Sequence, residues 1–322
     1  MLISGNMMDG FGSYRASVPR AQILSVSSDD GWLKKLRASF LAGLKSSLSD
    51  PELSLAASYL FGRSDMLPDS LSEAIRNVGL SHIVAVSGFH LGLVLTFSRK
   101  VFGKLSRFAT LWSGVLLSLL FGALTGFGAS MSRATVASLF SLVTWYFGRK
   151  LHPVRAICYT ATIMLAIKPS WFLDLGWQFS FLAYAGIVIF APVVTRYFYG
   201  DAKPNLLAAS IIQSISAQLL CLPITLYNFG KVALLGIFLN LIISPILGST
   251  MLFSALAAIP RIGQFFAPLS YYLLHVQIWL IERAARISWG LALFEPGRSE
   301  YFVIYAFVVL LFVIIHFRSR PP

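Results

Sequence analysis

The chain has 322 residues, of which 57% are hydrophobic and only 12% are charged, and its net charge is +13. Because soluble domains carry about 25% charged residues, this composition excludes an ordinary soluble globular protein. The predicted fold class is all-α: a polytopic membrane helix bundle with broken or re-entrant helices. The positive charge has two interpretations, which are attraction to anionic lipids with basic residues on the cytoplasmic side, or a pathway for a polyanion.

The first 31 residues are rich in Gly, Ser, Met and Asp and lack the charged start and apolar core of a signal peptide. We predict a disordered leader over 1–31. Residues 32–79 are predicted to form amphipathic and short helices before the membrane domain. Between Trp32 and Leu48, apolar residues recur every three or four positions with basic residues between them, which is typical of a basic amphipathic helix. This N-terminal helix lies either on the membrane surface or on the protein itself.

Two short helices are predicted after the amphipathic one. Asp50, Pro51 and Glu52 favour a helix start because they supply a cap, a first-turn proline and an acid near the positive end of the helix dipole. This helix is expected to stop at Gly62. A second short helix is predicted to begin at Pro68.

The membrane domain is predicted to occupy residues 80–317. A helix needs about 20 mostly apolar residues to cross a bilayer. Nine apolar segments approach this length: 80–98, 108–127, 131–148, 154–167, 176–198, 206–226, 232–259, 264–288 and 301–317. The short 154–167 segment is expected to be re-entrant or tilted. The 232–259 segment contains Pro245 and Gly248 and is expected to be discontinuous.

Basic residues gather in alternate connections between these segments and in the short tail at 318–322. Because cytoplasmic loops carry an excess of Lys and Arg, nine spans would place the basic connections and the C-terminus in the cytoplasm. The chain is therefore predicted to cross its membrane several times.

Polar residues inside an apolar span are the first candidates for function. The first span contains His82, Ser87, Gly88 and His90. Ser87 and His90 are three residues apart and would share a helical face, while Gly88 would let the helix open or another backbone approach. No carboxylate or thiolate lies nearby, so no metal site is predicted. These residues either serve function or make a hydrogen-bonded helix contact.

Five further polar residues lie in or beside the later spans, and each also has an ordinary structural interpretation: Arg133, Asp174, Gln178, Gln218 and Asn240. Arg133 either reaches towards lipid headgroups or faces phosphates, which suit its planar fork. Asp174 either caps a helix or shares a polar face with Gln178. Gln218 and Asn240 either hold helices together or line a wet pore.

The arrangement of these residues resembles the ComEC competence family. Four elements in the family's order carry the resemblance: GLSHIVAVSGFHLGL from Gly79, GASMSRA from Gly128, FLDLGWQFSFLAYAGIVIFAP from Phe172, and SISAQLLCLPITLYNFGKVALLGIFLNLIISP from Ser214. The resemblance implies a multi-pass channel in the bacterial inner (cytoplasmic) membrane that passes single-stranded DNA inward during natural transformation. Its expected partners are membrane lipids, a DNA receptor, a nuclease, a helicase-like translocase and other copies of the chain.

Members of that family usually add an N-terminal OB-like domain and a C-terminal metallo-β-lactamase-like domain. The 31 residues before Trp32 are too short for an OB fold, and the sequence has no His-rich metal motif. We therefore expect no enzyme activity, no catalytic residues, no metal and no cofactor. Without a Walker A motif, the energy for pulling DNA is expected to come from a partner.

Three other functions remain open on the sequence. A small-solute transporter would also need polar groups within its spans, although no pair of ion-coupling carboxylates is present. A non-conducting or split-system subunit would need separate OB and metallo-β-lactamase-like partners. An intramembrane hydrolase would use Ser87 and His90, but no orienting acid or oxyanion arrangement is readable.

Overall fold

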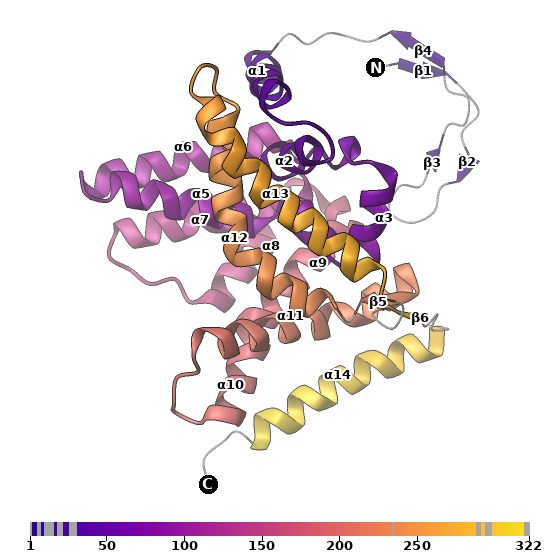
Figure 1. Ribbon diagram of the computed structural model, residues 1–322. Helices are drawn as coiled ribbons and strands as arrows, with labels where there is room; N and C mark the ends of the chain where they lie inside the picture. Colours follow the sequence, from indigo (N-terminus) through magenta and orange to yellow (C-terminus); the bar gives the residue numbers. More distant parts are fainter. Residues whose placement is uncertain are drawn as a thin grey trace.

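The computed structural model describes residues 31–233, 235–287, 291–293 and 298–318, together with four short N-terminal strands. The described part of the chain is built from helices, which confirms the predicted all-α class (Figure 1). Its N-terminal helical elements are α1 (Trp32–Ser47), α2 (Glu52–Phe61), η1 (Ser64–Met66), α3 (Asp69–Asn77), α4 (Ser81–Val84), α5 (Gly88–Phe102), α6 (Arg107–Thr125) and α7 (Ala129–Tyr146). The later ones are α8 (Pro153–Ile167), η2 (Pro169–Leu173), α9 (Leu175–Ala185), η3 (Gly186–Phe190), α10 (Ala191–Tyr199), α11 (Leu206–Phe229), α12 (Gly236–Ala257), α13 (Gly263–Ala285) and α14 (Arg298–Arg318).

Short strands form three antiparallel pairs. β1 (Leu2–Ser4) pairs with β4 (Gln22–Ser25), and β2 (Met8–Asp9) pairs with β3 (Ala16–Ser17). The rest of the first 30 residues lies outside the described part of the chain, so the disordered leader stays a prediction. The third pair joins β5 (Lys231–Ala233) to β6 (Leu291–Leu293) and brings the chain after α13 back to the start of α12.

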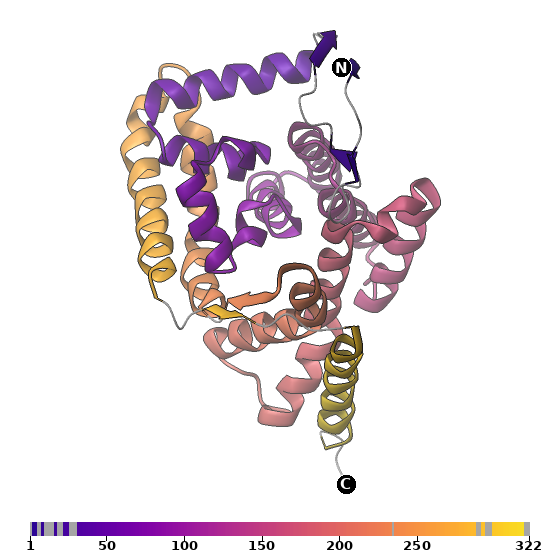
Figure 2. The ribbon, with the colours of Figure 1, turned by 90° about the vertical axis from the view of Figure 1, so that its right-hand side faces the viewer.

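Four helical stretches are long and apolar enough to cross a membrane: Arg107–Thr125, Leu175–Tyr199, Leu206–Phe229 and Gly236–Ala257. Two shorter apolar helices, Pro153–Ile167 and Phe302–Arg318, accompany them. The chain is therefore a multi-pass membrane protein. Helix α6 packs against both α5 and α7, and α12 and α13 run side by side (Figures 1 and 2). Helix α14 packs against α10 and α11.

The opening that Gly88 was expected to allow is present in the first predicted span, whereas the break expected in the 232–259 segment was wrong. The first predicted span, 80–98, is interrupted, because α4 ends at Val84 and α5 begins only at Gly88. The 232–259 segment was expected to be discontinuous, yet α12 is one helix that runs through Pro245. A proline in a membrane helix frees one backbone carbonyl, and neighbouring groups can satisfy it without breaking the helix.

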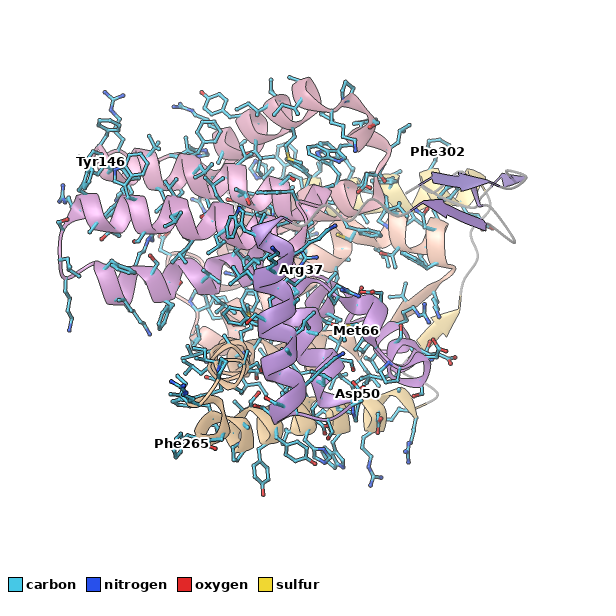
Figure 3. The ribbon with its side chains drawn as sticks, turned by 90° about the horizontal axis from the view of Figure 1, so that it is seen from above. Arg37, Asp50, Met66, Tyr146, Phe265 and Phe302 are labelled. Atoms are coloured by element: carbon cyan, nitrogen blue, oxygen red, sulfur yellow. The ribbon has the colours of Figure 1, made fainter. Side chains whose placement is uncertain are left out.

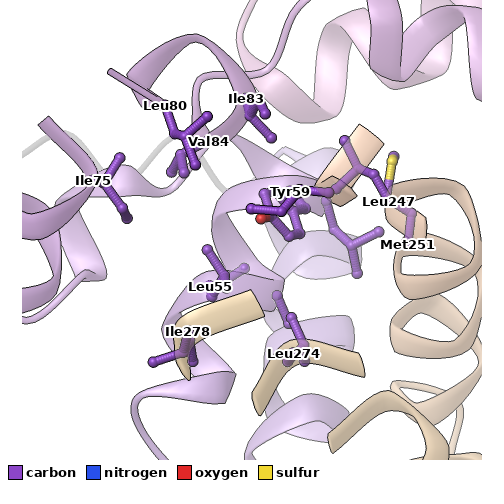
Figure 4. Close-up of a cluster of buried hydrophobic side chains, with 14 of the residues drawn as sticks. Leu55, Tyr59, Ile75, Leu80, Ile83, Val84, Leu247, Met251, Leu274 and Ile278 are labelled. Atoms are coloured by element: carbon purple, nitrogen blue, oxygen red, sulfur yellow. The ribbon is translucent and has the colours of Figure 1, made fainter. Parts of the chain in front are cut away.

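The centre of the N-terminal half is α2, whose residues are all buried. Leu55 and Tyr59 of α2 meet Leu274 and Ile278 of α13 in one hydrophobic cluster (Figure 4). The Asp50 cap predicted for this helix is absent, because α2 has no side-chain capping hydrogen bond. The helices between the amphipathic segment and the membrane domain therefore form part of the packed core.

A buried hydrogen-bond chain ties α2 to α12 and α13. The Tyr59 hydroxyl donates to Oε1 of Gln277 at 2.9 Å, and Nε2 of Gln277 donates to Oγ1 of Thr250 at 2.7 Å. All three side chains are almost completely buried. Buried polar groups left without partners are expensive, so this chain fixes how α2 is oriented against α12 and α13.

The amphipathic helix α1 packs on the protein through its C-terminal half. Leu44 is fully buried, and Ser47 Oγ donates to the carbonyl of Ala257 at 3.0 Å. Arg37 donates to the carbonyl of Leu124, and Figure 3 places Arg37 over the body of the molecule. Trp32, at the other end of α1, is 65% exposed. The packed alternative therefore holds for the C-terminal half and for Arg37, whereas Trp32, Lys34 and Lys35 in the first turn keep the exposed apolar and basic side chains that suit a membrane surface.

Gly43 is expected to be essential for this docking. A Cβ atom at Gly43 would collide with the carbonyl oxygen of Ala258 at the end of α12. Because a backbone carbonyl cannot move aside as a flexible side chain can, Gly43→Ala should lift α1 and expose the peptide bond after Lys45 to trypsin. Limited proteolysis of the purified chain measures this, with Ala42→Ser on the exposed face of α1 as the control. Equal cleavage of both variants would contradict the close approach.

Candidate functional site

The interruption between α4 and α5 positions the polar residues of the first predicted span. Ser87 is the N-cap of α5, with an extended backbone at φ −136°. Its N–H donates to Nδ1 of His90 at 3.4 Å, as in a capping box. The predicted proximity of Ser87 and His90 is therefore present, although it arises from a cap and not from a shared face of one continuous helix.

His90 acts inside the core and not on a surface. Its side chain is fully buried, and its ring centre lies 5.9 Å from that of Tyr59. Because Nδ1 accepts from the Ser87 backbone, the ring hydrogen belongs on Nε2, which is buried and has no partner among the described residues. His90 therefore positions the start of α5 against α2.

Arg133 of α7 lies beside the same helix start. Its Nε donates to Oγ of Ser180 on α9 at 2.6 Å, and Ser130 donates to the same oxygen at 3.1 Å. The guanidinium carbon lies 5.0 Å from the ring centre of Tyr184, within the range of a cation–π interaction. The Phe181 ring centre lies 6.0 Å from the same carbon, and the hydrogen bond to Ser180 uses only Nε of the guanidinium.

Gly88 lets the Arg133 side chain approach the N-terminus of α5. A Cβ atom at Gly88 would lie 2.8 Å from Nη2 of Arg133 and 3.3 Å from Cβ of Ala134. Within the described ranges, the ion pairs are Arg63–Asp65 and Glu52–His275, so Arg133 has no carboxylate partner there. A helix N-terminus and an unpaired guanidinium both favour an anion. Their combination makes this location a candidate anion-binding site.

A second polar group lies on the other side of the interruption, around His82 and Asn240. Nδ1 of His82 lies 3.0 Å from the Gly79 carbonyl, and the His82 ring also interacts with the side chain of Asn240 on α12. Asn240 donates to Oγ of Ser214 on α11 at 3.2 Å and accepts from Ser244 at 2.7 Å. These bonds join α4 to α11 and α12. The interruption is thus held by polar contacts on both sides.

Three other predicted site residues do not take part in these two groups. Asp174 caps α9, since its carboxylate accepts from the Trp177 N–H at 2.9 Å. Nε2 of Gln178 donates to the Phe172 carbonyl at 2.9 Å, and this bond stabilises the turn before α9. Gln218 is half-buried in α11. The ordinary capping interpretation of Asp174 is therefore confirmed.

Sequence reasoning missed Tyr184 and Ser244. Each lies four residues after another polar residue of the same helix, Tyr184 after Ser180 and Ser244 after Asn240. Residues four apart share one face of a helix, so this spacing was the available signal. Among the described residues, no three His, Cys, Asp or Glu side chains gather as metal ligands.

Comparisons with known proteins extend over most of the chain. It is 26% identical over 230 residues to "ComE operon protein 3" of Bacillus subtilis (strain 168), which covers 70% of this chain and 28% of that protein. It is 25% identical over 259 residues to an uncharacterized protein of Aquifex aeolicus (strain VF5), with 79% of this chain and 60% of the relative covered.

A third relative, "Uncharacterized protein MG316 homolog" of Mycoplasma pneumoniae, is 26% identical over 263 residues, covering 79% of this chain and 65% of the relative. The chain thus spans less than two thirds of each of these relatives. No solved structure matches significantly. The family model described as "Competence protein" matches residues 59–320, which include both polar groups around the α4–α5 interruption. The chain therefore belongs to the competence protein family.

Proposed function

We propose that the chain conducts single-stranded DNA across a bacterial inner membrane into the cytoplasm during natural transformation. The observation that carries the proposal is the unpaired Arg133 guanidinium beside Gly88, at a helix N-terminus within a membrane protein of the competence family. Charged side chains are rare within the membrane-spanning part of a protein, and those that occur there commonly mark the path of an ion or substrate.

In this proposal, Arg133 contacts the phosphates of a passing strand. Its bond to Ser180 occupies Nε, which leaves the two terminal nitrogens free to meet phosphate oxygens. Transient contacts suit conduction because a strand that binds tightly cannot move on. Base recognition is not required, so no sequence preference is expected.

The other candidates support this contact in different ways. Ser87 and Gly88 supply the start of α5, whose backbone N–H groups face an incoming anion. His82 is exposed and can contact the strand directly, whereas the buried His90 keeps α5 in place. Asn240 holds His82, and Gln178 and Asp174 hold the start of α9, which carries Ser180.

The proposed pathway needs partners that supply work and substrate. We propose a DNA receptor, a nuclease and a helicase-like translocase, together with membrane lipids and a second copy of the chain. The chain itself is proposed to have no enzymatic activity and to use no cofactor.

Uptake of labelled DNA by cells with and without the gene tests the proposal. Deletion should leave surface-bound DNA at its normal level and abolish internalised DNA, because only the inner-membrane step is removed. Loss of both surface-bound and internalised DNA would mean that the protein acts in capturing DNA at the cell surface. Unchanged internalisation would reject the channel and favour a solute transporter, which competition between DNA and small solutes then examines.

A further inference from the structure

A hollow of about 590 Å³ lies where the end of α1 meets the loop between α12 and α13. Its walls come from Ser46 to Ser49 on one side and from the loop and the first turns of α13 on the other. This volume lies within the usual range of small-molecule sites. The hollow is remote in sequence from the α4–α5 interruption, and the proposed DNA path does not use it.

The hollow carries hydrogen-bond donors that suit a phosphate group. Arg261, Gln264 and Ser49 line it, and none of its described lining residues is acidic. Arg261 forms no ion pair with a described carboxylate. A guanidinium that is free of a carboxylate presents a planar fork of N–H groups, which matches two phosphate oxygens.

Two serine hydroxyls in the hollow have a different role. Ser46 donates to the carbonyl of Gly43 at 2.7 Å, and Ser47 donates to the carbonyl of Ala257 at 3.0 Å. With their hydrogens engaged, both oxygens keep lone pairs that accept hydrogen bonds. The hollow therefore suits a molecule that combines a phosphate with hydroxyl groups.

The backbone of Arg261 is held in an unusual conformation. Its φ is +71°, a region that side chains other than glycine rarely adopt. Such residues persist only where the surroundings enforce them, and they gather at ligand sites. Here the conformation brings the Arg261 side chain to the hollow, between α12 and α13.

The hollow opens beside an apolar face at the level where a membrane helix ends. The α12 helix is one of the four that can cross a membrane, and the loop that carries Arg261 follows it directly. Along α13, one exposed apolar face starts at the hollow and continues along the helix; it consists of Phe265, Leu269, Tyr272, Val276 and Trp279. Phe265 is 74% exposed and lies at the periphery of the molecule (Figure 3).

We propose that this hollow binds the headgroup of an anionic phospholipid. Arg261 and Gln264 would hold the phosphate, the Ser46 and Ser47 oxygens would accept from headgroup hydroxyls, and the acyl chains would lie along the exposed face of α13. The apolar face favours a lipid over a DNA strand, because a strand offers no acyl chain to cover it. The site would anchor α1 and the α12–α13 loop to the membrane surface.

Native mass spectrometry of the full chain, released from detergent with added lipid, tests the site. Phosphatidylglycerol should bind, phosphatidylcholine should bind more weakly, and Arg261→Gln should lower phosphatidylglycerol binding by about tenfold, since one charge-assisted contact is lost. Arg261→Gly should do the same while keeping the backbone conformation, which guards against misfolding. Arg286→Gln, at the exposed far end of α13, is the matched control and should change nothing.

Three outcomes would overturn the proposal. If Arg261→Gln and Arg286→Gln lowered phosphatidylglycerol binding equally, the lipid would be attracted by positive charge in general and not by this hollow. Binding of soluble glycerophosphoglycerol as tight as that of the lipid would indicate a free phosphate ester as ligand. Displacement of the lipid by a single-stranded oligonucleotide would assign the hollow to DNA.

Discussion

Replacing Arg133 with alanine is expected to lower the internalisation of labelled DNA by about tenfold to a hundredfold, while surface-bound DNA stays constant. A charge-assisted hydrogen bond contributes about 1.5–3 kcal/mol, and each 1.4 kcal/mol corresponds to about a factor of ten. Arg133 has no described carboxylate partner, so its removal leaves no carboxylate unpaired in the membrane domain. The protein should therefore still accumulate normally.

Two further substitutions separate charge from geometry at this position. Arg133→Lys keeps the charge but loses the planar fork and the Nε bond to Ser180, so uptake should fall by less than in Arg133→Ala. Gly88→Ala keeps Arg133 but places a Cβ atom only 2.8 Å from its Nη2, so the guanidinium must shift and uptake should also fall.

Arg107→Ala is the matched control for these substitutions, because Arg107 is exposed at the start of α6. Its uptake should equal that of the unchanged protein, measured at equal protein levels by immunoblot. If Arg133→Ala also takes up DNA normally, Arg133 only joins α7 to α9, and the DNA path runs elsewhere.

The sequence was a reliable guide to which segments form helices. Eight of the nine predicted apolar segments correspond to helical stretches with similar bounds, such as 108–127 for Arg107–Thr125 and 206–226 for Leu206–Phe229. Long apolar runs determine this outcome because a membrane leaves few alternatives for the backbone. The helix end predicted at Gly62 follows equally directly, since this glycine has positive φ in the cap.

The candidate site was less predictable, because its residues meet only through packing. Ser87 was interpreted as a residue inside a helix, whereas it ends the interruption and caps α5. A serine inside an apolar run fits either role, and the extended backbone of Ser87 identifies it as the cap. The pairings of Arg133 with Ser180 and of His82 with Asn240 connect residues distant in sequence. Spacing along one helix cannot predict such contacts.

Gly186→Ala is expected to destabilise the protein by about 1–3 kcal/mol, the usual range for overpacking. Gly186 begins the π-helical turn η3, where a Cβ atom would lie 2.6 Å from the Ser216 carbonyl oxygen and 2.8 Å from Cα of Ala217. Both atoms belong to the backbone of α11 and cannot rotate away. Close backbone contact through small residues is a main source of helix association in membranes.

Glycine-to-alanine substitution at Gly92 should not lower the stability of the protein. Gly92 lies within α5, and an added Cβ atom there would meet nothing within 4 Å. Alanine is more favourable than glycine in a helix by about 0.8–1 kcal/mol, so Gly92→Ala should be neutral or stabilising. Thermal unfolding in detergent compares the two variants. Alanine also favours the helix at position 186. Gly186→Ala therefore unfolds at a lower temperature than the unchanged protein only if the free-energy cost of the backbone collision exceeds this gain. Equal stability of the two variants would mean that α11 moves away readily, and the α9–η3–α10 helix would then be only loosely packed against it.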